Sequence, residues 1–364
     1  MEQPALKPPL RRGWTTGTCA TAASRAAYQA LLTGAFPDPV PVVLPNGSRP
    51  CFALASSELA QAFARAGVIK DAGDDPDVTH GALIMATVRQ GAPASGVTFR
   101  AGQGVGTVTR PGLPLPPGEP AINPVPRAMI RAAIAEVAAQ FGGSGDADIE
   151  LSIPGGEKIA ERTLNARLGI VGGLSILGTT GIVVPYSCAA WIHSIHRGID
   201  VARAAGLAHV AGATGATSEA AIARLHNLPE AALIDMGDFV GGMLKYLRRH
   251  PVPRVTVAGG MAKMTKLGQG LLDLHSRRGE VDLSWLSQIA IDQGGDAELA
   301  AAIAGSNSAM EAFGHAQAAG IDLPAGVAAS AWRTAAQALG RDMRLDVVIF
   351  DRSGDLLARA ESSQ

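Results

Sequence analysis

Aromatic and charged residues are both scarce in this chain of 364 residues, in which 4% are Phe, Trp or Tyr and 17% are Asp, Glu, Lys or Arg. No basic run is interleaved with the aromatic residues, so the stacking surfaces that bind single-stranded nucleic acid are missing. The formal net charge of -1 provides no field that would attract a polyanion or an anionic membrane. We therefore expect no nucleic-acid partner, and an acidic ligand has to be bound by local groups.

Cysteine is rare as well. Cys19, Cys51 and Cys188 are odd in number and form no CxxC pattern, which argues against a disulfide framework and a structural zinc site. Near the N-terminus, prolines stand where a signal peptide would carry an apolar stretch. These features predict a reducing compartment and a cytoplasmic location.

Charge is absent between Arg167 and Arg197, a length of chain that could cross a bilayer. Residues 168–195, however, include five glycines, a Thr-Thr pair and a proline. Such residues favour buried strands and turns over a spanning helix. We expect no membrane partner.

The length of 364 residues exceeds the size at which a single hydrophobic core stops growing, about 250–300 residues. We predict an α/β protein of two domains, residues 1–184 and 185–364. The first is expected to be an α+β domain with a mixed sheet. Its helices are predicted at 16–32 and 127–141, and its strands at 40–44, 51–54, 83–88, 97–100, 149–153 and 182–184. The strands 83–88 and 97–100 are expected to pair with each other.

Helices and strands alternate regularly in the second part of the chain. This alternation is typical of βαβ crossovers onto a parallel sheet, so we predict a Rossmann-like domain. The expected helices are 190–205, 218–226, 239–249, 263–275, 297–319 and 325–339. The expected strands are 207–210, 233–235, 255–258 and, as the last one, 347–350.

Three glycines, Gly102, Gly104 and Gly106, resemble a nucleotide-binding motif at first sight. Their spacing is GxGxG rather than GxGxxG, and the next residues, 107–109, favour a strand rather than a helix. A glycine-bearing hairpin or bulge is therefore predicted. The alternative is a close approach of backbone N–H groups to a ligand, assisted by Arg110.

Residues 70–81 carry an acidic cluster. It comprises Asp71, Asp74, Asp75 and Asp77, with Lys70 and His80 beside them. Mutual repulsion is expected to raise the pKa of some of these carboxyls, which prepares a general base or a cation site. A calcium loop is excluded because Pro76 and Ala82 stand where that loop needs glycine and glutamate. A solvated acidic turn is the alternative.

Residues 210–219 follow a predicted strand and open a predicted helix, the position where α/β sheets bind ligands. Small residues there let backbone N–H groups approach a carboxylate or phosphate, and Thr217 or Ser218 is expected to cap the helix. Glu219 either meets a ribose hydroxyl or complements the helix dipole, while a tight connection without a ligand stays open. The expected cofactor-binding residues are Gly212, Thr214, Gly215, Thr217, Glu219, Asp235 and Asp238.

Several familiar motifs are absent from the sequence. His193 and His196 have helical spacing but lack an HExxH pattern. No serine nucleophile elbow, Walker loop or kinase signature occurs. We therefore expect no metal ligands and no covalent nucleophile.

Five segments together resemble the CbiD family, the cobalt-precorrin-5B (C(1))-methyltransferases. They are GWTTGTCATAA at 13–23, VIKDAGDDPDVTHGA at 68–82, GQGVGTVTRPGLP at 102–114, LNARLGIVGGLSILGTTGIVVP at 164–185 and DMGDFVGGML at 235–244. This chain departs from the family pattern at 187–189, where acidic residues are usual, and at Gly259-Gly260, where Gly-His is usual. Cys188, in the first of these departures, is interpreted as a small buried residue at a helix start, with a reactive thiol as the alternative.

The resemblance implies transfer of a methyl group from S-adenosylmethionine, the cofactor, to a small-molecule cobalt-corrin precursor in cobalamin biosynthesis. Cobalt-precorrin-5B would become cobalt-precorrin-6A. An NAD-dependent corrin oxidoreductase and a non-enzymatic tetrapyrrole or cobalt carrier are the alternatives, and a homo-oligomer stays open.

The roles of individual residues are our hypothesis within this resemblance. Asp75 is the first candidate for the proton acceptor, and Asp74 and His80 are the reserves. The residues expected to face the tetrapyrrole are Thr15, Thr16, Thr18, Lys70, Asp71, Asp77 and Arg110. Further cations that could bind the substrate carboxylates are Arg100, Arg127, Lys158 and Arg167.

Overall fold

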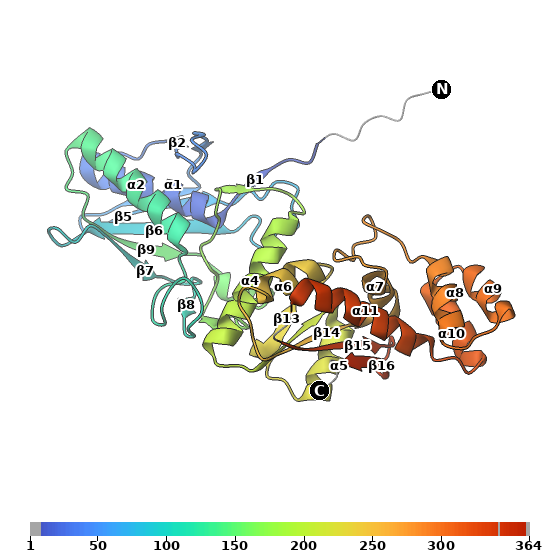
Figure 1. Ribbon diagram of the computed structural model, residues 1–364. Coiled ribbons are helices and arrows are strands. Elements are labelled where there is room, and N and C mark those ends of the chain that lie inside the picture. The colour runs from blue at the N-terminus through green and yellow to red at the C-terminus, as the bar shows by residue number, and fades with distance from the viewer. Residues whose placement is uncertain (1–8, 341–342, 362–364) are drawn as a thin grey trace, which may run out of the picture. The chain divides into compact units, whose positions relative to one another are not determined.

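The computed structural model describes residues 9–340 and 343–361 (Figure 1). These residues form two compact units, which join between Cys188 and Ala189. Both units combine helices with a five-stranded sheet, and the strands pair in parallel as well as antiparallel fashion. The prediction of mixed α and β structure is confirmed.

The sheet of the first unit has the strand order β4-β5-β6-β9-β7. The strands are β4 (Ser56–Leu59), β5 (Ala64–Ile69), β6 (Leu83–Gln90), β9 (Ala147–Ser152) and β7 (Val97–Ala101). The pairing of β7 with β9 is parallel and the other pairings are antiparallel. The predicted pairing of 83–88 with 97–100 is wrong, because β9 lies between these strands and buries Ile149 and Leu151.

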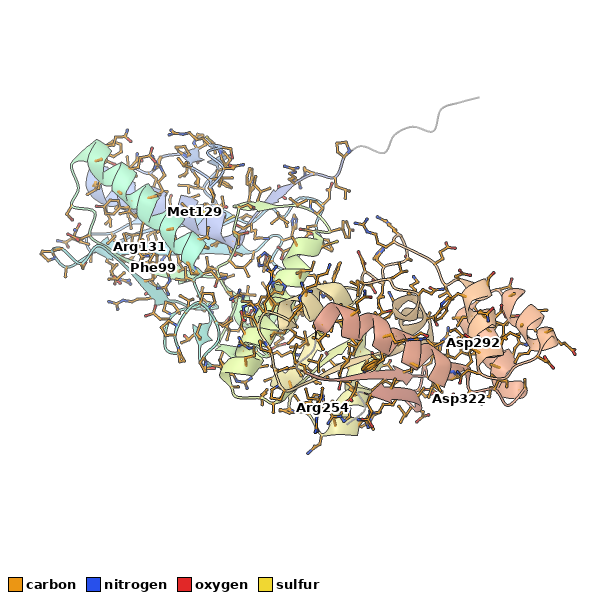
Figure 2. The ribbon with its side chains drawn as sticks, in the orientation of Figure 1. Phe99, Met129, Arg131, Arg254, Asp292 and Asp322 are labelled. Carbon is orange, nitrogen blue, oxygen red and sulfur yellow. The ribbon has the colours of Figure 1, made fainter. Side chains whose placement is uncertain are left out.

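Two helices, α1 (Thr16–Thr33) and α2 (Pro124–Phe141), cover one face of this sheet (Figure 1). The alanines of α1 are almost completely buried, and their small side chains let the helix lie close to both α2 and the sheet. The guanidinium of Arg131 in α2 lies 5.1 Å from the ring centroid of Phe99 in β7 (Figure 2). Both predicted helices of this unit are confirmed.

Short strand pairs complete the first unit. β2 (Val40–Pro41) pairs with β3 (Cys51–Phe52), β8 (Thr107–Val108) with β10 (Ile170–Val171), and β1 (Gly13–Trp14) with β11 (Ile182–Val183). The helix α3 spans Gly156–Ala160. The charge-free stretch thus supplies β10 and β11, and no helix in the described part of the chain is both long and apolar enough to cross a membrane.

The glycine motif allows backbone segments to pack directly against each other. A Cβ atom on Gly104 would lie 1.9 Å from the carbonyl oxygen of Ile153, and one on Gly173 would lie 2.3 Å from the carbonyl carbon of Gly104. Gly104 also has a φ of +72°, in the left-handed region that favours glycine. The motif therefore has a packing role, which accounts for its spacing without a ligand.

We expect Gly104→Ala to lower the free energy of unfolding by about 3 kcal/mol or more, since it adds a steric clash to a strained φ. Gly118→Ala is the matched control, because Gly118 also has a positive φ, +93°, but nothing lies within 4 Å of its added Cβ. The control should cost only about 1 kcal/mol. Urea unfolding of both variants measures the difference, and equal losses would contradict the packing role.

The sheet of the second unit has the order β13-β12-β14-β15-β16. The first four strands are mutually parallel and β16 is antiparallel to β15. The strands are β12 (His209–Ala213), β13 (Leu233–Asp235), β14 (Arg254–Gly260), β15 (Arg344–Phe350) and β16 (Leu356–Glu361).

Helices cover both faces of this second sheet. One face packs Ala221 and Ile222 of α5 (Ala216–His226) in a small core cluster with residues such as Val348. The other face forms the large core with α4 (Cys188–Ala204), α6 (Val240–Leu247), α7 (Met261–Gly268) and α11 (Leu323–Leu339). Three more helices extend that core, α8 (Leu283–Asp292), α9 (Ala297–Ala304) and α10 (Ala309–Ala318).

Three element predictions for the second unit are wrong. The helix 297–319 is two helices, because Ser308 caps a new helix by accepting a hydrogen bond from the Glu311 N–H at 3.2 Å. The helix 263–275 ends at Gly268, shortly before Gly270 adopts a φ of +94°. The strand 347–350 is not the last one, since β16 follows it, and α8 was not predicted.

Candidate functional site

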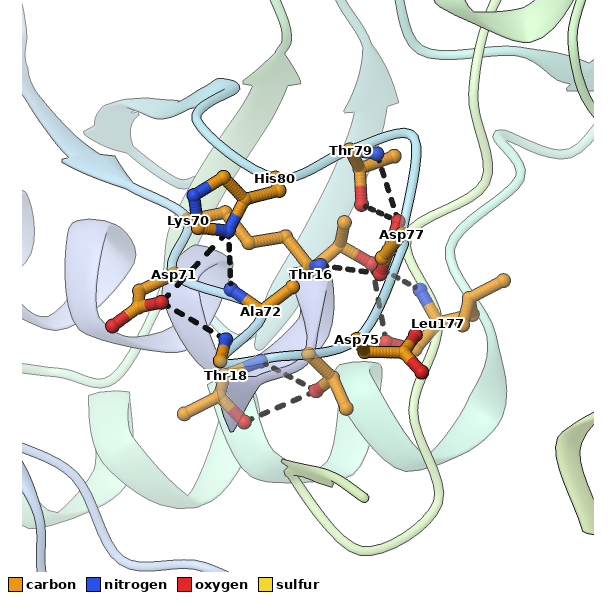
Figure 3. Close-up of polar contacts among 12 residues, drawn as sticks. Thr16, Thr18, Lys70, Asp71, Ala72, Asp75, Asp77, Thr79, His80 and Leu177 are labelled. Atoms are coloured by element: carbon orange, nitrogen blue, oxygen red, sulfur yellow. Dashed lines mark hydrogen bonds and ion pairs between the residues drawn. The ribbon is translucent and has the colours of Figure 1, made fainter. Parts of the chain in front are cut away.

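The acidic loop contains an ion pair whose lysine is buried and whose carboxylate is partly exposed. Lys70 is 1% exposed, and its Nζ lies 2.5 Å from Oδ2 of Asp77 (Figure 3). Oδ1 of Asp77 accepts hydrogen bonds from the backbone N–H of Thr79 at 2.8 Å and from its hydroxyl at 2.6 Å. Burial acts to raise the pKa of Asp77, but the Lys70 charge and these hydrogen bonds lower it overall. This carboxylate is therefore ionised and fixed in place.

Asp71 has a cationic partner that lies outside the loop. Both oxygens of its carboxylate bind the guanidinium of Arg11, and Oδ1 accepts a hydrogen bond from Gly73 N–H at 2.9 Å. The Arg11 hydrogen bond is the main reason why the pKa of Asp71 is lowered to about 2. The expectation that repulsion raises the pKa values is wrong for Asp71 and for Asp77, because each carboxylate has its own cation.

The next two carboxylates point to different partners. Oδ2 of Asp74 accepts a hydrogen bond from Arg11 N–H at 2.6 Å, whereas Oδ1 of Asp75 accepts one from Tyr186 N–H at 2.8 Å. The second oxygen of Asp75 has no hydrogen-bond partner among residues 9–340 and 343–361. This leaves it available to accept a proton.

His80 lies on the solvent side of the loop, with 53% of its side chain exposed. Its Nδ1 accepts a hydrogen bond from Ala72 N–H at 3.1 Å (Figure 3). In this geometry the neutral ring carries its proton on Nε2. The loop therefore orients His80 with Nε2 as its outward-facing nitrogen donor.

The threonines at the start of α1 hold the glycine-rich segment 177–181. Thr16 Oγ1 donates to Leu177 O at 3.1 Å and accepts from Leu177 N–H at 2.9 Å. Thr18 Oγ1 donates to Gly181 O at 2.7 Å, and Thr15 caps the helix by accepting from Thr18 N–H at 3.2 Å. These buried hydroxyls are thus already engaged with the protein, and their predicted contact with a tetrapyrrole stays a prediction.

The candidate cations of the first unit differ in their partners. Arg100 pairs with Asp148 at 3.0 Å and Arg127 with Glu119 at 2.8 Å. Arg110 is exposed, donates to the carbonyl of Arg167 at 3.4 Å, and forms no ion pair with any described residue. Of these three arginines, Arg110 is the one whose charge is free to bind an anionic ligand. Lys158 lies exposed in α3.

Apolar side chains are exposed on the same segments that carry the acidic loop and its partners. Tyr186 is the extreme case at 68% exposure. The others on these segments are Leu10, Ile69, Leu177 and Val184. A contiguous patch of exposed apolar side chains is typical of a binding surface, so these residues are candidates for contact with an apolar ligand.

In the second unit, the sheet order defines a point where the chain reverses direction across the sheet. From β12 the chain crosses to β13 on one side, and it later returns to β14 on the other side of β12. Such a switch point, at the carboxyl ends of parallel strands, is the usual ligand site of open α/β sheets. Thr214, directly after β12, donates its N–H to Ala258 O of β14 at 3.0 Å, so it lies at this point.

The predicted cofactor residues divide between strand and loop. Gly212 lies inside β12, where an added Cβ would lie 2.3 Å from Sδ of Met243, so it serves packing. Gly215 is the N-cap of α5 without a side-chain cap hydrogen bond. The predicted capping by Thr217 or Ser218 is therefore wrong, since Ser218 Oγ donates back to Gly215 O at 2.9 Å. Thr217 and Glu219 lie in the first turn of the helix.

The loop after β13 lies beside this switch point. Gly237, with a φ of +52°, donates its N–H to Ala213 O, at the end of β12, at 3.2 Å. Asp238 is ion-paired with Lys263, whose Nζ also donates to Leu274 O at 3.3 Å. Trp191, which no sequence motif singles out, donates its Nε1–H to the carbonyl of Asp235 at 3.1 Å.

The residues that depart from the family pattern lie around the start of α4 and at the end of β14. Cys188 is the first residue of α4, as predicted, but it is exposed rather than buried. Gly259 and Gly260 end β14. An added Cβ on Gly259 would lie 2.8 Å from Oγ1 of Thr214, so glycine leaves room there for that loop.

A histidine-containing cluster lies at the opposite, amino-terminal end of the second sheet. The ligand atoms of His209, His226 and Asp346 lie within 4.8 Å of one another. The Asp346 carboxylate, however, already binds Arg254, whose Nε lies 3.0 Å away, and Arg359 lies at 3.4 Å. These two positive charges oppose a cation there.

This cluster predicts acid sensitivity of the second unit. Burial, and then the Arg254 charge, lower the pKa of His209 to about 4 from its ordinary 6.5. Between these two values the unfolded chain therefore binds more protons at His209 than the folded chain does. The contribution of His209 to the free energy of unfolding is fully present above pH 6.5 and is lost as the pH drops toward 4. Allowing for solvent screening, we expect a loss of about 1–2 kcal/mol.

Melting temperatures between pH 7 and pH 4 measure this effect. His209→Gln should have a shallower pH dependence than the wild type, because it removes one titrating group. Parallel curves for the two proteins would contradict the assignment.

The chain is similar to proteins of one family over both units. A family model described as CbiD matches residues 3–185, and one described as CbiD, C-terminal domain, matches residues 273–361. A cobalt-precorrin-5B C(1)-methyltransferase of Bradyrhizobium sp. is 65% identical over 357 residues, which cover 97% of this chain and 94% of the relative. One of Agrobacterium fabrum is 64% identical over 355 residues, with coverages of 97% and 94%.

One solved structure is similar as well. It is a 1.9 Å crystal structure of the cobalamin biosynthesis protein (cbiD) from Archaeoglobus fulgidus. That protein is 28% identical, and the match covers 74% of this chain and 83% of that chain with a TM-score of 0.41.

Proposed function

Because this chain belongs to the CbiD family, we propose that it is a cobalt-precorrin-5B C(1)-methyltransferase of cobalamin biosynthesis. The observation that carries this conclusion is the 65% identity to a methyltransferase of that name over 97% of the chain. The methyl donor is S-adenosylmethionine, as the reaction requires. The substrate is a small cobalt-containing tetrapyrrole.

The described residues fit the demands of this reaction. S-adenosylmethionine supplies a methyl group that is already electrophilic, so the protein needs to position the reactants, exclude water and accept one proton. None of these tasks requires a covalent nucleophile. A carboxylate oxygen, oriented but without a partner, is the group that suits the proton transfer.

We place the tetrapyrrole on the acidic-loop face of the first unit, with Asp75 as the proton acceptor. Three observations support this placement. Tyr186 N–H holds one oxygen of Asp75 and leaves the other available, Arg110 is free to bind a substrate carboxylate, and apolar side chains for a macrocycle are exposed on the neighbouring segments. Lys70 and Asp77 keep the loop in shape through their ion pair, and their predicted contact with the substrate stays a prediction.

We place S-adenosylmethionine at the switch point of the second unit, which we interpret as a doubly wound, Rossmann-like sheet. The order β13-β12-β14-β15 corresponds to the first four strands of 2-1-3-4-5, a common doubly wound order. The uncapped first turn of α5 fits the donor's carboxylate, because its backbone N–H groups have no side-chain acceptor at the N-cap. Asp235, at the end of β13, suits the ribose hydroxyls.

The function is tested by incubating the protein with cobalt-precorrin-5B and S-adenosylmethionine. Mass spectrometry of the tetrapyrrole should show the gain of one CH2 unit, and S-adenosylhomocysteine should accumulate in equal amount. Calorimetric titrations with S-adenosylhomocysteine and with NADH separate the competing functions. Binding of NADH alone would indicate an oxidoreductase, and tight tetrapyrrole binding without either ligand would indicate a carrier.

A further inference from the structure

Trp191 is an unusual side chain to leave in solvent. It lies in the first turn of α4 and is 46% exposed, although a tryptophan usually gains several kcal/mol from burial. The indole is nonetheless held in place, because its Nε1 donates to Asp235 O at 3.1 Å. It also lies against Gly237, where an added Cβ would be 3.4 Å from the ring.

The position of the indole connects it with the switch point. Asp235 is the last residue of β13, and Gly237 donates its N–H to Ala213, the last residue of β12. The ring is thus anchored where both strands end. Since Gly237 has a φ of +52°, a larger residue there would be strained, and its Cβ would be in ordinary van der Waals contact with the indole.

A fixed, half-exposed aromatic ring at the end of two parallel strands suits a flat, uncharged ring as its ligand. Bases stack on aromatic side chains because every base has a π-face, and the rigid indole loses little conformational entropy on binding. Asp235 accepts the hydrogen bond of the indole through its backbone carbonyl, and it also carries a side-chain carboxylate. Acidic residues at this strand end characteristically accept hydrogen bonds from ribose hydroxyls.

We propose that the exposed indole of Trp191 is the platform on which the adenine ring of the methyl donor stacks, with the ribose directed toward Asp235. This assignment rests on the proposed function, because it takes the donor to be an adenosyl compound. It makes Trp191 a residue that binds the adenosine part of the donor and not the methyl group.

Calorimetric titration with S-adenosylhomocysteine tests the platform. Trp191→Ala should bind it about 10- to 100-fold more weakly than the wild type, the range typical of base–aromatic stacking. Trp191→Phe keeps an aromatic ring and should stay within about threefold. Trp191→Leu keeps the apolar bulk without a π-face, and it should lose nearly as much affinity as Trp191→Ala.

Trp332→Phe is the matched control. The Trp332 indole also donates its Nε1–H to a backbone carbonyl, that of Leu345, at 3.1 Å. Leu345 lies near the amino end of β15, away from the switch point. In the wild type and in Trp332→Phe, S-adenosylhomocysteine should quench tryptophan fluorescence, whereas most of this quenching should be lost in Trp191→Phe.

The possible outcomes test the stacking role of Trp191 separately from the proposed methyltransferase function. If Trp191→Leu binds S-adenosylhomocysteine as tightly as the wild type does, or if Trp191→Phe keeps the full quenching, the platform is wrong while the methyltransferase assignment stands. If the wild type itself binds no adenosyl compound, the proposed function fails first. Because Trp191 is 46% exposed, the three Trp191 variants should keep melting temperatures close to that of the wild type.

Discussion

Replacing Asp75 by Asn should lower kcat by about 10²- to 10⁴-fold, the usual contribution of a positioned general base. The amide keeps the shape of the carboxylate, and its oxygen can still accept the hydrogen bond that Tyr186 N–H donates at 2.8 Å. It cannot, however, take up the proton that leaves the substrate. Binding of S-adenosylhomocysteine should stay within about threefold of wild type, because Asp75 has no role in placing the donor. Single-turnover mass spectrometry and calorimetry measure these two quantities.

Asp74→Asn is the control for this prediction. Its carboxylate accepts a hydrogen bond from Arg11 N–H at 2.6 Å, so its role is to tie the loop to the segment before β1. We expect its kcat to fall less than about tenfold. Full activity in Asp75→Asn would remove the assignment, and a large loss in Asp74→Asn or His80→Gln would then identify the true base.

Replacing Asp77 by Ala should lower the free energy of unfolding by about 3–5 kcal/mol, the cost of breaking a buried ion pair from one side. The Lys70 ammonium group, at 1% exposure, would lose its carboxylate partner. The hydrogen bonds from Thr79 would be lost in the same change. Urea unfolding, followed by circular dichroism, measures the shift in midpoint and shows whether the slope is unchanged.

Glu58→Ala serves as the matched control for the ion pair. Glu58 pairs with Arg65 at 2.9 Å, but both side chains are exposed, and such pairs contribute at most about 1 kcal/mol. Asp77→Asn should fall between the two variants, since its amide oxygen can still accept from Lys70 and Thr79. A loss in Asp77→Ala as small as that in Glu58→Ala would show that Lys70 reaches water when its partner is removed.

Much of the fold could be predicted from local patterns. The alanine-rich helix α1 and the alternating strands of the second unit have the periodicity of their final structures, and their boundaries agree to within a few residues. Strand partners were harder to predict. β9 lies between β6 and β7 although it is about 60 residues distant along the chain from β6 and about 50 from β7. No local pattern records such a pairing, because tertiary contacts decide it.

The sequence predicted which residues form the acidic loop, but it did not predict the lowered pKa values of Asp71 and Asp77. The acidic residues of the loop were recognised as a group, yet the partner that lowers the pKa of Asp71 lies 60 residues earlier, at Arg11. The density of acidic residues along the sequence predicts repulsion between them. In the folded protein, however, Asp71 and Asp77 each have a cationic partner. Trp191 was missed for a related reason, since a single aromatic residue in a helix has no periodic signal until its neighbours are known.

The hydrogen bonds between the start of α1 and residues 177–181 have a consequence for protein synthesis. Thr16 and its partner Leu177 are separated by 161 residues, so at about 5–20 residues per second the ribosome needs roughly 10–30 s to deliver the second after the first. Throughout that interval the amino end of α1 lacks its native acceptors, and β1 lacks β11. The first unit therefore completes its fold only when its last segment has emerged from the ribosome.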